Sequence, residues 1–136
     1  MRIIYEGFFV NPNVELHSVL DKDIEFKHIT TEFKPSKTHE HLYGKTANFV
    51  VKGYGNDDVN EGILVGISSS EDRELNELFN NIGVPHITLS VSNDGKPVNT
   101  SKLDFNQPIP SELDGQTIQC TFGGFTGAKP IFTREN

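Results

Sequence analysis

Two copies of a short polar pattern carry the residues of this chain that are best suited to chemistry. The first copy is His28-Ile29-Thr30, and the second is His86-Ile87-Thr88. Successive side chains of a β-strand alternate between its two faces, so the histidine and threonine of each copy project to the same side. Ile29 and Ile87 then project to the opposite, apolar side. Each copy therefore predicts a half-buried strand with one chemically active face.

The same alternation predicts which neighbours share each face. In the first strand, Glu32 joins the active face, whereas Thr31 and Phe33 join the apolar face. In the second strand, Val84 and Ser90 join the active face. Pro85, Leu89 and Val91 are then expected on the apolar face.

Two imidazoles and two hydroxyls that face one another suit the cleavage of a phosphodiester. One proton must leave the nucleophile and another must reach the leaving oxygen, on opposite sides of phosphorus. Histidine can do both, because its unperturbed pKa of ~6.5 keeps both protonation states populated near neutrality. The threonine hydroxyls can donate hydrogen bonds to phosphate oxygens as charge builds up on them. The sequence leaves open which histidine is the acid and which is the base.

The paired triplets resemble the signature of the 2H phosphoesterase superfamily, which includes cyclic phosphodiesterases and RNA-repair phosphodiesterase domains. The stretch from Tyr43-Gly44-Lys45 through Phe49-Val50-Val51-Lys52-Gly53-Tyr54 to Pro85-His86-Ile87-Thr88-Leu89-Ser90 is most similar to the phosphodiesterase domains of fungal and plant tRNA ligases. The resemblance covers residues 3 to 104 and is strongest at the two triplets. Membership of the superfamily is therefore a firmer expectation than any one substrate.

The resemblance and the order of elements imply one α+β domain over residues 1–136. We expect two antiparallel sheet halves that form a cleft, with helices outside, as in a bilobal 2H phosphoesterase-like domain. The expected catalytic residues are His28, Thr30, His86 and Thr88. The expected activity is metal-independent and cofactor-free cleavage of a nucleotide phosphodiester, of the kind used in RNA repair. By resemblance, the substrate is a 2′,3′-cyclic phosphate at an RNA end or on a small nucleotide.

Three other functions stay open at this stage. The same residues suit the degradation of a cyclic oligonucleotide signal, as 2H enzymes of some viruses do against bacterial defence. A non-catalytic nucleotide-binding protein is a second alternative, although a binder needs no pair of titrating groups. The third is a β-rich interaction domain without a pocket.

Four further residues are expected to contact the substrate, namely Tyr5, Tyr43, Lys45 and Lys52. The two lysines flank a predicted strand and are placed to put positive charge beside the histidines, or else they are simply exposed on a sheet. The pair in His39-Glu40-His41 supplies only two ligands, whereas zinc usually takes three or four. The main prediction for this segment is therefore a solvated loop. The alternatives are a role at the edge of the substrate site and a role as metal ligands.

The first half of the chain predicts a strand, a helix and a second strand. Residues 1–10 form a β-rich apolar run. Asn11 and Pro12 are suited to begin a helix, and apolar residues follow at helical spacing over Val14 to Leu20. A polar turn at residues 21–23 then leads into a strand over 24–33.

The second half repeats this order with stronger signals. Residues 46–54 and 62–67 predict a hairpin that turns at 55–58. A helix is predicted to start with a cap at Ser68–Glu71 and to end at Gly83, followed by the second triplet strand. After a turn at 93–95 and a loop at 106–114, residues 117–122 predict a last strand, and the chain end is expected to fray. The repeated order suggests an internal duplication, although no repeat beyond the triplets is visible residue by residue.

Composition bounds the class of protein. The chain has 136 residues, the size of one domain, and its single cysteine, Cys120, cannot form an intramolecular disulfide. We expect a cytoplasmic protein, because no signal sequence and no apolar run of ~20 residues is present. The net charge of −7 argues against an extended nucleic-acid surface. The expected partner is therefore a small nucleotide or RNA end held in a compact pocket, and the oligomeric state stays open.

Overall fold

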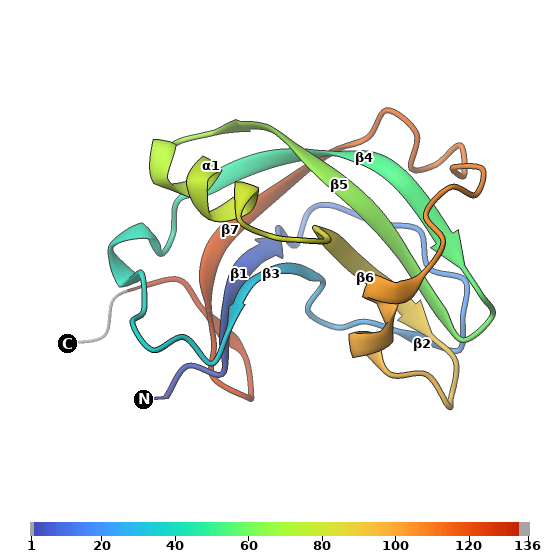
Figure 1. Ribbon diagram of the computed structural model, residues 1–136, viewed down its shortest axis with the longest axis horizontal. Coiled ribbons are helices and arrows are strands. Elements are labelled where there is room, and N and C mark those ends of the chain that lie inside the picture. The colour runs from blue at the N-terminus through green and yellow to red at the C-terminus, as the bar shows by residue number, and fades with distance from the viewer. Residues whose placement is uncertain (1, 134–136) are drawn as a thin grey trace.

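The protein is built on one eight-stranded, mostly antiparallel sheet with few helices, which gives an α+β fold (Figure 1). We describe residues 2–133 from a computed structural model. The strands are β1 (Tyr5–Val10), β2 (Lys22–Asp23), β3 (His28–Phe33), β4 (Thr46–Asn56), β5 (Asn60–Ser70), β6 (His86–Val91), β7 (Thr117–Phe125) and β8 (Pro130–Ile131). Their order in the sheet is β2-β6-β5-β4-β7-β1-β3, and β8 pairs with β7.

The sheet is arched, which brings two distant strands together. In Figure 1, β4 and β5 cross the top of the arch, β1 and β3 lie on one side of it, and β6 and β2 lie on the other. Four strands separate β3 from β6 in the sheet order, yet β3 and β6 are in contact. The two triplets start these two strands, so the arch is what brings them close.

Aromatic rings fill much of the core under the arch. Phe8 is fully buried, and its ring centroid lies 5.0 Å from that of Phe49 and 5.4 Å from that of Phe122. Ile29 and Ile87 are also fully buried, which confirms that the middle residue of each triplet faces the core. Cys120 lies in the same core, and burial raises the pKa of its thiol.

The hairpin, the helix after it and the last strand are confirmed, with shifted ends. β4 and β5 are each longer than predicted, and the turn between them lies at residues 57–59. Helix α1 (Arg73–Asn80) is capped by Asp72, whose side chain accepts from the backbone N–H of Glu74, because Ser68–Ser70 continue β5. The helix also ends at Asn81 and not at Gly83. Two 3₁₀ helices, η1 (Glu40–Leu42) and η2 (Pro97–Lys102), are the only other helical elements in residues 2–133.

The helix predicted over Val14 to Leu20 is wrong. This segment crosses the sheet without regular structure, because its backbone groups bond to distant side chains. The N–H of Val19 donates to buried Glu61, the N–H of Leu20 donates to Ser90, and the carbonyl of Glu15 accepts from Gln116. Tertiary hydrogen bonds therefore replace the helical ones.

Three smaller predictions about the strands also need correction. The turn expected at residues 21–23 contains β2, which pairs with β6. The strand expected from residue 24 starts only at His28. β8 lies in the part of the chain that was expected to fray, while residues 134–136 lie outside the described residues, as does Met1. No helix in the described part of the chain is long and apolar enough to cross a membrane.

A β-bulge follows each triplet and changes the faces predicted for the next residues. In β3, Glu32 pairs with Glu6 and Thr30 with Gly7, so Thr31 is the extra residue. In β6, Ser90 pairs with Glu61 and Thr88 with Gly62, so Leu89 is the extra residue. Because a bulge shifts the alternation by one, Phe33 turns to the face of His28, and Ser90 turns away from the face of His86. The prediction for both residues was the reverse.

Candidate functional site

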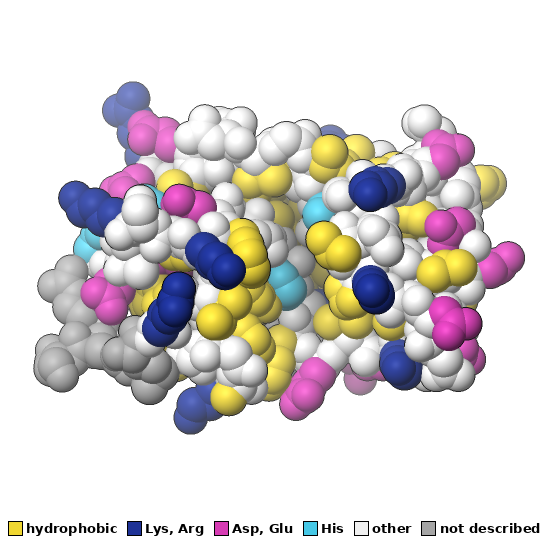
Figure 2. Space-filling model, turned by 60° about the horizontal axis from the view of Figure 1, so that its bottom comes forward, with side chains coloured by type: hydrophobic (Ala, Val, Ile, Leu, Met, Phe, Trp, Pro, Cys, Tyr) yellow, Lys and Arg dark blue, Asp and Glu magenta, His cyan; other side chains and the backbone are white. Residues whose placement is uncertain are grey.

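A pocket of about 730 Å³ lies between β3 and β6 and is lined by the histidine and the threonine of both triplets. Its lining residues are Tyr5, Ile24, Phe26, His28, Thr30, Phe33, His86, Thr88, Pro97, Val98, Ser101 and Phe125. In Figure 2, histidine side chains lie along a hollow in the middle of one face, with apolar side chains on both of its rims. The structure therefore brings together all four residues expected to be catalytic.

The two histidines are held by the same backbone contact. Nδ1 of His28 lies 2.8 Å from the carbonyl oxygen of Phe26, and Nδ1 of His86 lies 2.7 Å from that of Val84. In both cases the carbonyl belongs to the residue two positions before the histidine. A carbonyl oxygen can only accept, so each Nδ1 carries a proton and donates it. This fixes the tautomer of the neutral ring, and Nε2 of each ring is the nitrogen left for chemistry.

Aromatic packing surrounds His28 and changes its acidity. The ring of Tyr5 stacks on His28 at 4.5 Å, and Phe9 lies 5.5 Å from it. Burial lowers the pKa of His28 below its ordinary value, and the nearby charge of His86 lowers it further, against the hydrogen bond to Phe26. His28 is therefore held in its neutral form near pH 7. Burial also raises the pKa of Tyr5 to about 12, so its hydroxyl stays protonated.

The two threonines differ in their hydrogen bonding. The hydroxyl of Thr88 donates to Oγ1 of Thr100 at 2.8 Å, and Thr100 is a fully buried residue of η2. Thr100 in turn accepts from Nδ2 of buried Asn60 at 3.0 Å. For Thr30, the described residues supply no hydrogen-bond partner to the hydroxyl. The hydroxyl of Thr88 is thus oriented by a buried chain, while that of Thr30 is available to a ligand.

Most of the pocket wall is apolar, and sequence reasoning missed this wall. Phe33 is 63% exposed and Val98 is 74% exposed, and both line the pocket. Phe33 was assigned to the other face because the bulge at Thr31 has no clear sequence signal. Phe26, Phe125 and the η2 residues lie outside the triplet strands, so alternation gave no information about them. Exposed large apolar side chains would have indicated such a wall, but exposure is known only from the structure. The sequence therefore contained no usable signal for it.

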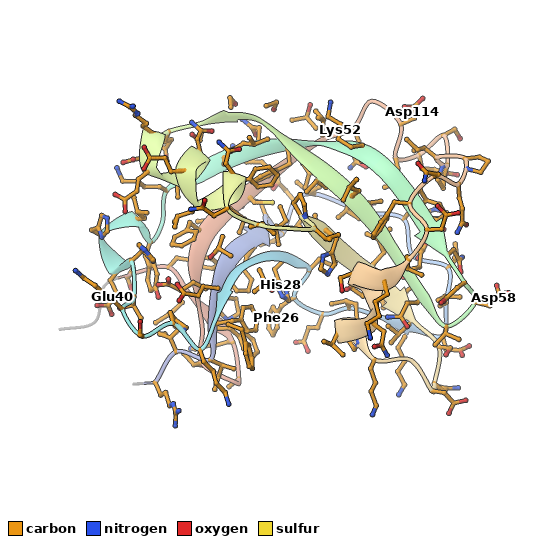
Figure 3. The ribbon with its side chains drawn as sticks, viewed as in Figure 1. Phe26, His28, Glu40, Lys52, Asp58 and Asp114 are labelled. Carbon is orange, nitrogen blue, oxygen red and sulfur yellow. The ribbon has the colours of Figure 1, made fainter. Side chains whose placement is uncertain are left out.

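Of the four residues expected to contact substrate, only Tyr5 lines this pocket. The hydroxyl of Tyr43 is buried and donates to Glu6 at 2.8 Å, and Nζ of Lys45 donates to Asp72 at 2.9 Å. Lys52 lies against Gly66 of β5, and Figure 3 shows it on the outer side of the arch, away from His28. The structure therefore does not bring Tyr43, Lys45 and Lys52 to the histidines.

The His39-Glu40-His41 segment lies at η1, and its two imidazoles have different partners. His39 binds Glu6 through Nδ1 at 2.8 Å, whereas Nε2 of His41 lies 2.9 Å from Glu74. Glu6, Glu32 and His39 form a group with ligand atoms close enough to hold a metal ion. However, both oxygens of Glu6 already accept hydrogen bonds, one of them from the backbone N–H of His39. A metal here has to displace the contact between Glu6 and His39, and none of the three residues lines the pocket.

Comparison of the chain with protein-family models, with curated proteins and with solved structures finds no match. We therefore argue the function from the residues of the pocket.

Proposed function

We propose that the protein is a metal-independent phosphodiesterase of the 2H type. The observation that carries this proposal is the repeated arrangement of the two histidines in one pocket. Each has Nδ1 bound to the carbonyl two residues earlier, Nε2 left for a ligand, and a threonine two residues later on the same strand face. The arched sheet, with β3 and β6 in contact, supports the bilobal architecture that the resemblance implies.

The different surroundings of the two rings suggest their roles. His28 is neutral near pH 7 because burial lowers its pKa, so it acts as the general base. Its Nε2 takes a proton from water, the water oxygen bonds to phosphorus, and one bridging P–O bond breaks. His86 acts as the general acid and gives the proton of its Nε2 to the leaving oxygen. The hydroxyl of Thr30 donates to a non-bridging oxygen, where charge builds up. Thr88 does the same once Thr100 turns its own hydroxyl hydrogen toward Oγ1 of Thr88, which releases the hydrogen that Thr88 gives to Thr100 in the free protein.

The pocket suits a nucleotide as substrate. A volume of about 730 Å³ lies in the range of pockets that hold small organic ligands. The aromatic wall offers rings on which a base can stack, at Tyr5, Phe26, Phe33 and Phe125. We propose a 2′,3′-cyclic phosphate, at an RNA end or on a small nucleotide, as the bond that is cleaved.

The test is a substrate panel with the metal removed. The protein is incubated in EDTA with 2′,3′-cyclic mononucleotides, an RNA with a cyclic phosphate end and cyclic dinucleotides, and products are identified by mass. We expect turnover in EDTA, and a loss of at least about 100-fold in the His28→Ala and His86→Ala variants. His41→Ala is the matched control, because this histidine is exposed and bound to Glu74 outside the pocket.

Three outcomes would contradict the proposal. Wild-type turnover in a His28 or His86 variant removes that histidine from the mechanism. Turnover that disappears in EDTA and returns with a metal removes the metal-independent step. Tight nucleotide binding without any product indicates a non-catalytic binder.

A further inference from the structure

A second pocket, of about 540 Å³, lies directly beside the first one. Phe26 lines both pockets and so forms the boundary between them. Phe9 also spans the boundary, because its ring centroid lies 5.5 Å from His28 and 5.8 Å from Phe132 of the second pocket. Figure 3 shows Phe26 next to His28. The two pockets therefore adjoin at Phe26.

The second pocket combines aromatic rings with one available positive charge. The rings of Phe132 and Phe9 meet edge to face at 81°, and both line this pocket together with Phe26. Lys129 lines the same pocket, and no described carboxylate forms an ion pair with it, whereas Lys27 is paired with Asp23 at 2.6 Å. Glu25 also lines this pocket without an ion pair among the described residues, so Lys129 is its one unpaired cation and Glu25 is its one unpaired carboxylate.

Polar groups in the same pocket add hydrogen-bonding capacity. Asn11 accepts from Thr121 through Oδ1 and donates one amide hydrogen to Gln119. An amide group has two hydrogens, so one of them has no described partner. Base rings stack on aromatic side chains, base edges bond to amides, and a phosphate pairs with lysine. The set of groups therefore fits one nucleotide.

We propose that the second pocket binds the nucleotide next to the scissile phosphodiester. The preferred ligand is then an oligonucleotide of at least two units, linear or cyclic, and not a mononucleotide. This inference rests on the proposed function for the position of the scissile bond. The shared wall at Phe26 and the lysine without an ion pair, Lys129, are the observations that carry it.

Binding without turnover tests the second pocket directly. Calorimetry compares uridine 3′-phosphate with the dinucleotide uridylyl-uridine 3′-phosphate, neither of which contains a cyclic phosphate. We expect the dinucleotide to bind about 10- to 100-fold more tightly, the scale of one stacked base. Lys129→Ala and Phe132→Ala should each remove most of this gain and leave the affinity for the mononucleotide unchanged. Lys52→Ala is the matched control, because this lysine lies on the outer side of the sheet.

The two affinities decide the inference even if the protein does not catalyse the proposed reaction. The second site is ruled out if the two ligands bind with equal affinity or if the dinucleotide does not bind. It is also ruled out if both variants keep the higher affinity for the dinucleotide. Cleavage rates then distinguish linear from cyclic ligands. They are compared for a mononucleotide, a linear dinucleotide with a cyclic phosphate end and a cyclic dinucleotide. If none of the three is cleaved, the proposed function fails, while the affinities still report on the pocket. Thermal melting of Lys129→Ala and Phe132→Ala shows whether each variant is folded.

Discussion

His28 and His86 make the same backbone contact but differ in their surroundings, and this difference decides what each can do. Tyr5 stacks on His28, and burial lowers the pKa of the buried ring. The nearby charge of His86 acts in the same direction, since two like charges disfavour each other. When the environment holds one histidine of a pair neutral, that histidine is suited to be the base and the other is suited to be the acid.

The first prediction concerns the titration of His28. We expect its NMR titration midpoint below 6.5, and a rise in that midpoint in His86→Gln, because one cause of the lowering is removed. The pKa should remain below 6.5 in this variant, since burial is the larger cause. His41→Gln serves as the control and should leave the midpoint of His28 unchanged. If neutral His28 is the base, as proposed, kcat/KM should fall on the acid side with a midpoint below 6.5. A midpoint above 6.5 by NMR would contradict the assignment of His28 as the base.

The second prediction concerns the hydroxyls of the two threonines. Thr→Val at Thr30 or Thr88 keeps the shape and deletes the donor, so kcat should fall by roughly 10- to 1000-fold if the bond strengthens in the transition state. Thr→Ser should retain most activity. A rise in KM with unchanged kcat indicates ground-state binding instead. Wild-type behaviour of both valine variants would make the side chains structural.

Thr100 supplies the third prediction, because it orients Thr88 without lining the pocket. Thr100→Val removes the link to Asn60 and should lower kcat less than Thr88→Val does, with little change in KM. Thr100→Ser restores the hydroxyl and should restore kcat. If Thr100→Val loses stability but keeps wild-type kcat per folded molecule, Thr100 has no positioning role.

At the scale of elements, β3 and β6 also resemble each other in the strand that each one pairs with. Each pairs with a strand that carries Glu-Gly opposite the bulge, Glu6-Gly7 for β3 and Glu61-Gly62 for β6. A Cβ at Gly7 would overlap the carbonyl oxygen of Ile29, and one at Gly62 would press on that of Ile87 and overlap the methyl group of Thr100. Both glycines therefore allow a close approach of the strand that holds the histidine.

The fourth prediction tests this close approach with alanine. Gly7→Ala and Gly62→Ala should each destabilise the protein by about 1 to 3 kcal/mol, the scale of overpacking, and should lower activity by displacing the triplet strand. Gly83→Ala is the matched control, since a Cβ there meets no atom within 4 Å. Urea unfolding measures the stabilities. If the Gly7 and Gly62 variants are as stable as the Gly83 variant, the strands can move apart without a loss of folding free energy, and the prediction is wrong.

The sequence predicted the elements that depend on local signals. Alternation located β3 and β6, turn residues located the hairpin, and helical spacing located α1. It did not predict the bulges, because an extra residue leaves no mark in composition. It also predicted a helix at Val14 to Leu20, where Glu61 and Ser90 compete for the backbone N–H groups. The face that carries the two histidines and two threonines was therefore predictable, whereas the aromatic wall depends on the bulges and on the curvature of the sheet.

At the scale of the whole molecule, the order of elements does not repeat, because the first half lacks the predicted helix, but a set of residue contacts does repeat. Glu6 and Glu61 are both fully buried, and each accepts a hydrogen bond from a tyrosine hydroxyl, at 2.8 Å from Tyr43 and 2.6 Å from Tyr54. A histidine also contacts each carboxylate, His39 at Glu6 and His17 at Glu61. The Glu-Gly dipeptides are thus a second residue-level repeat that the sequence contained and that was overlooked. The two carboxylates fix the segments that cross the sheet, including the one around Val19.

The fifth prediction concerns how charge acts over the whole molecule. A protein that contacts six to ten phosphates loses about 10³- to 10⁵-fold in affinity between 50 and 200 mM salt. With a net charge of −7 and one available lysine in the second pocket, this chain should contact one or two phosphates of a single strand. The expected salt slope is then about −0.7 to −1.4, which is roughly a 3- to 7-fold loss of dinucleotide affinity over the same range. Lys129→Ala should lower the slope by about 0.7 for the dinucleotide and leave it unchanged for the mononucleotide. A loss above about 100-fold in the unaltered protein would instead indicate an extended phosphate-binding surface, because only several phosphate contacts produce so steep a dependence.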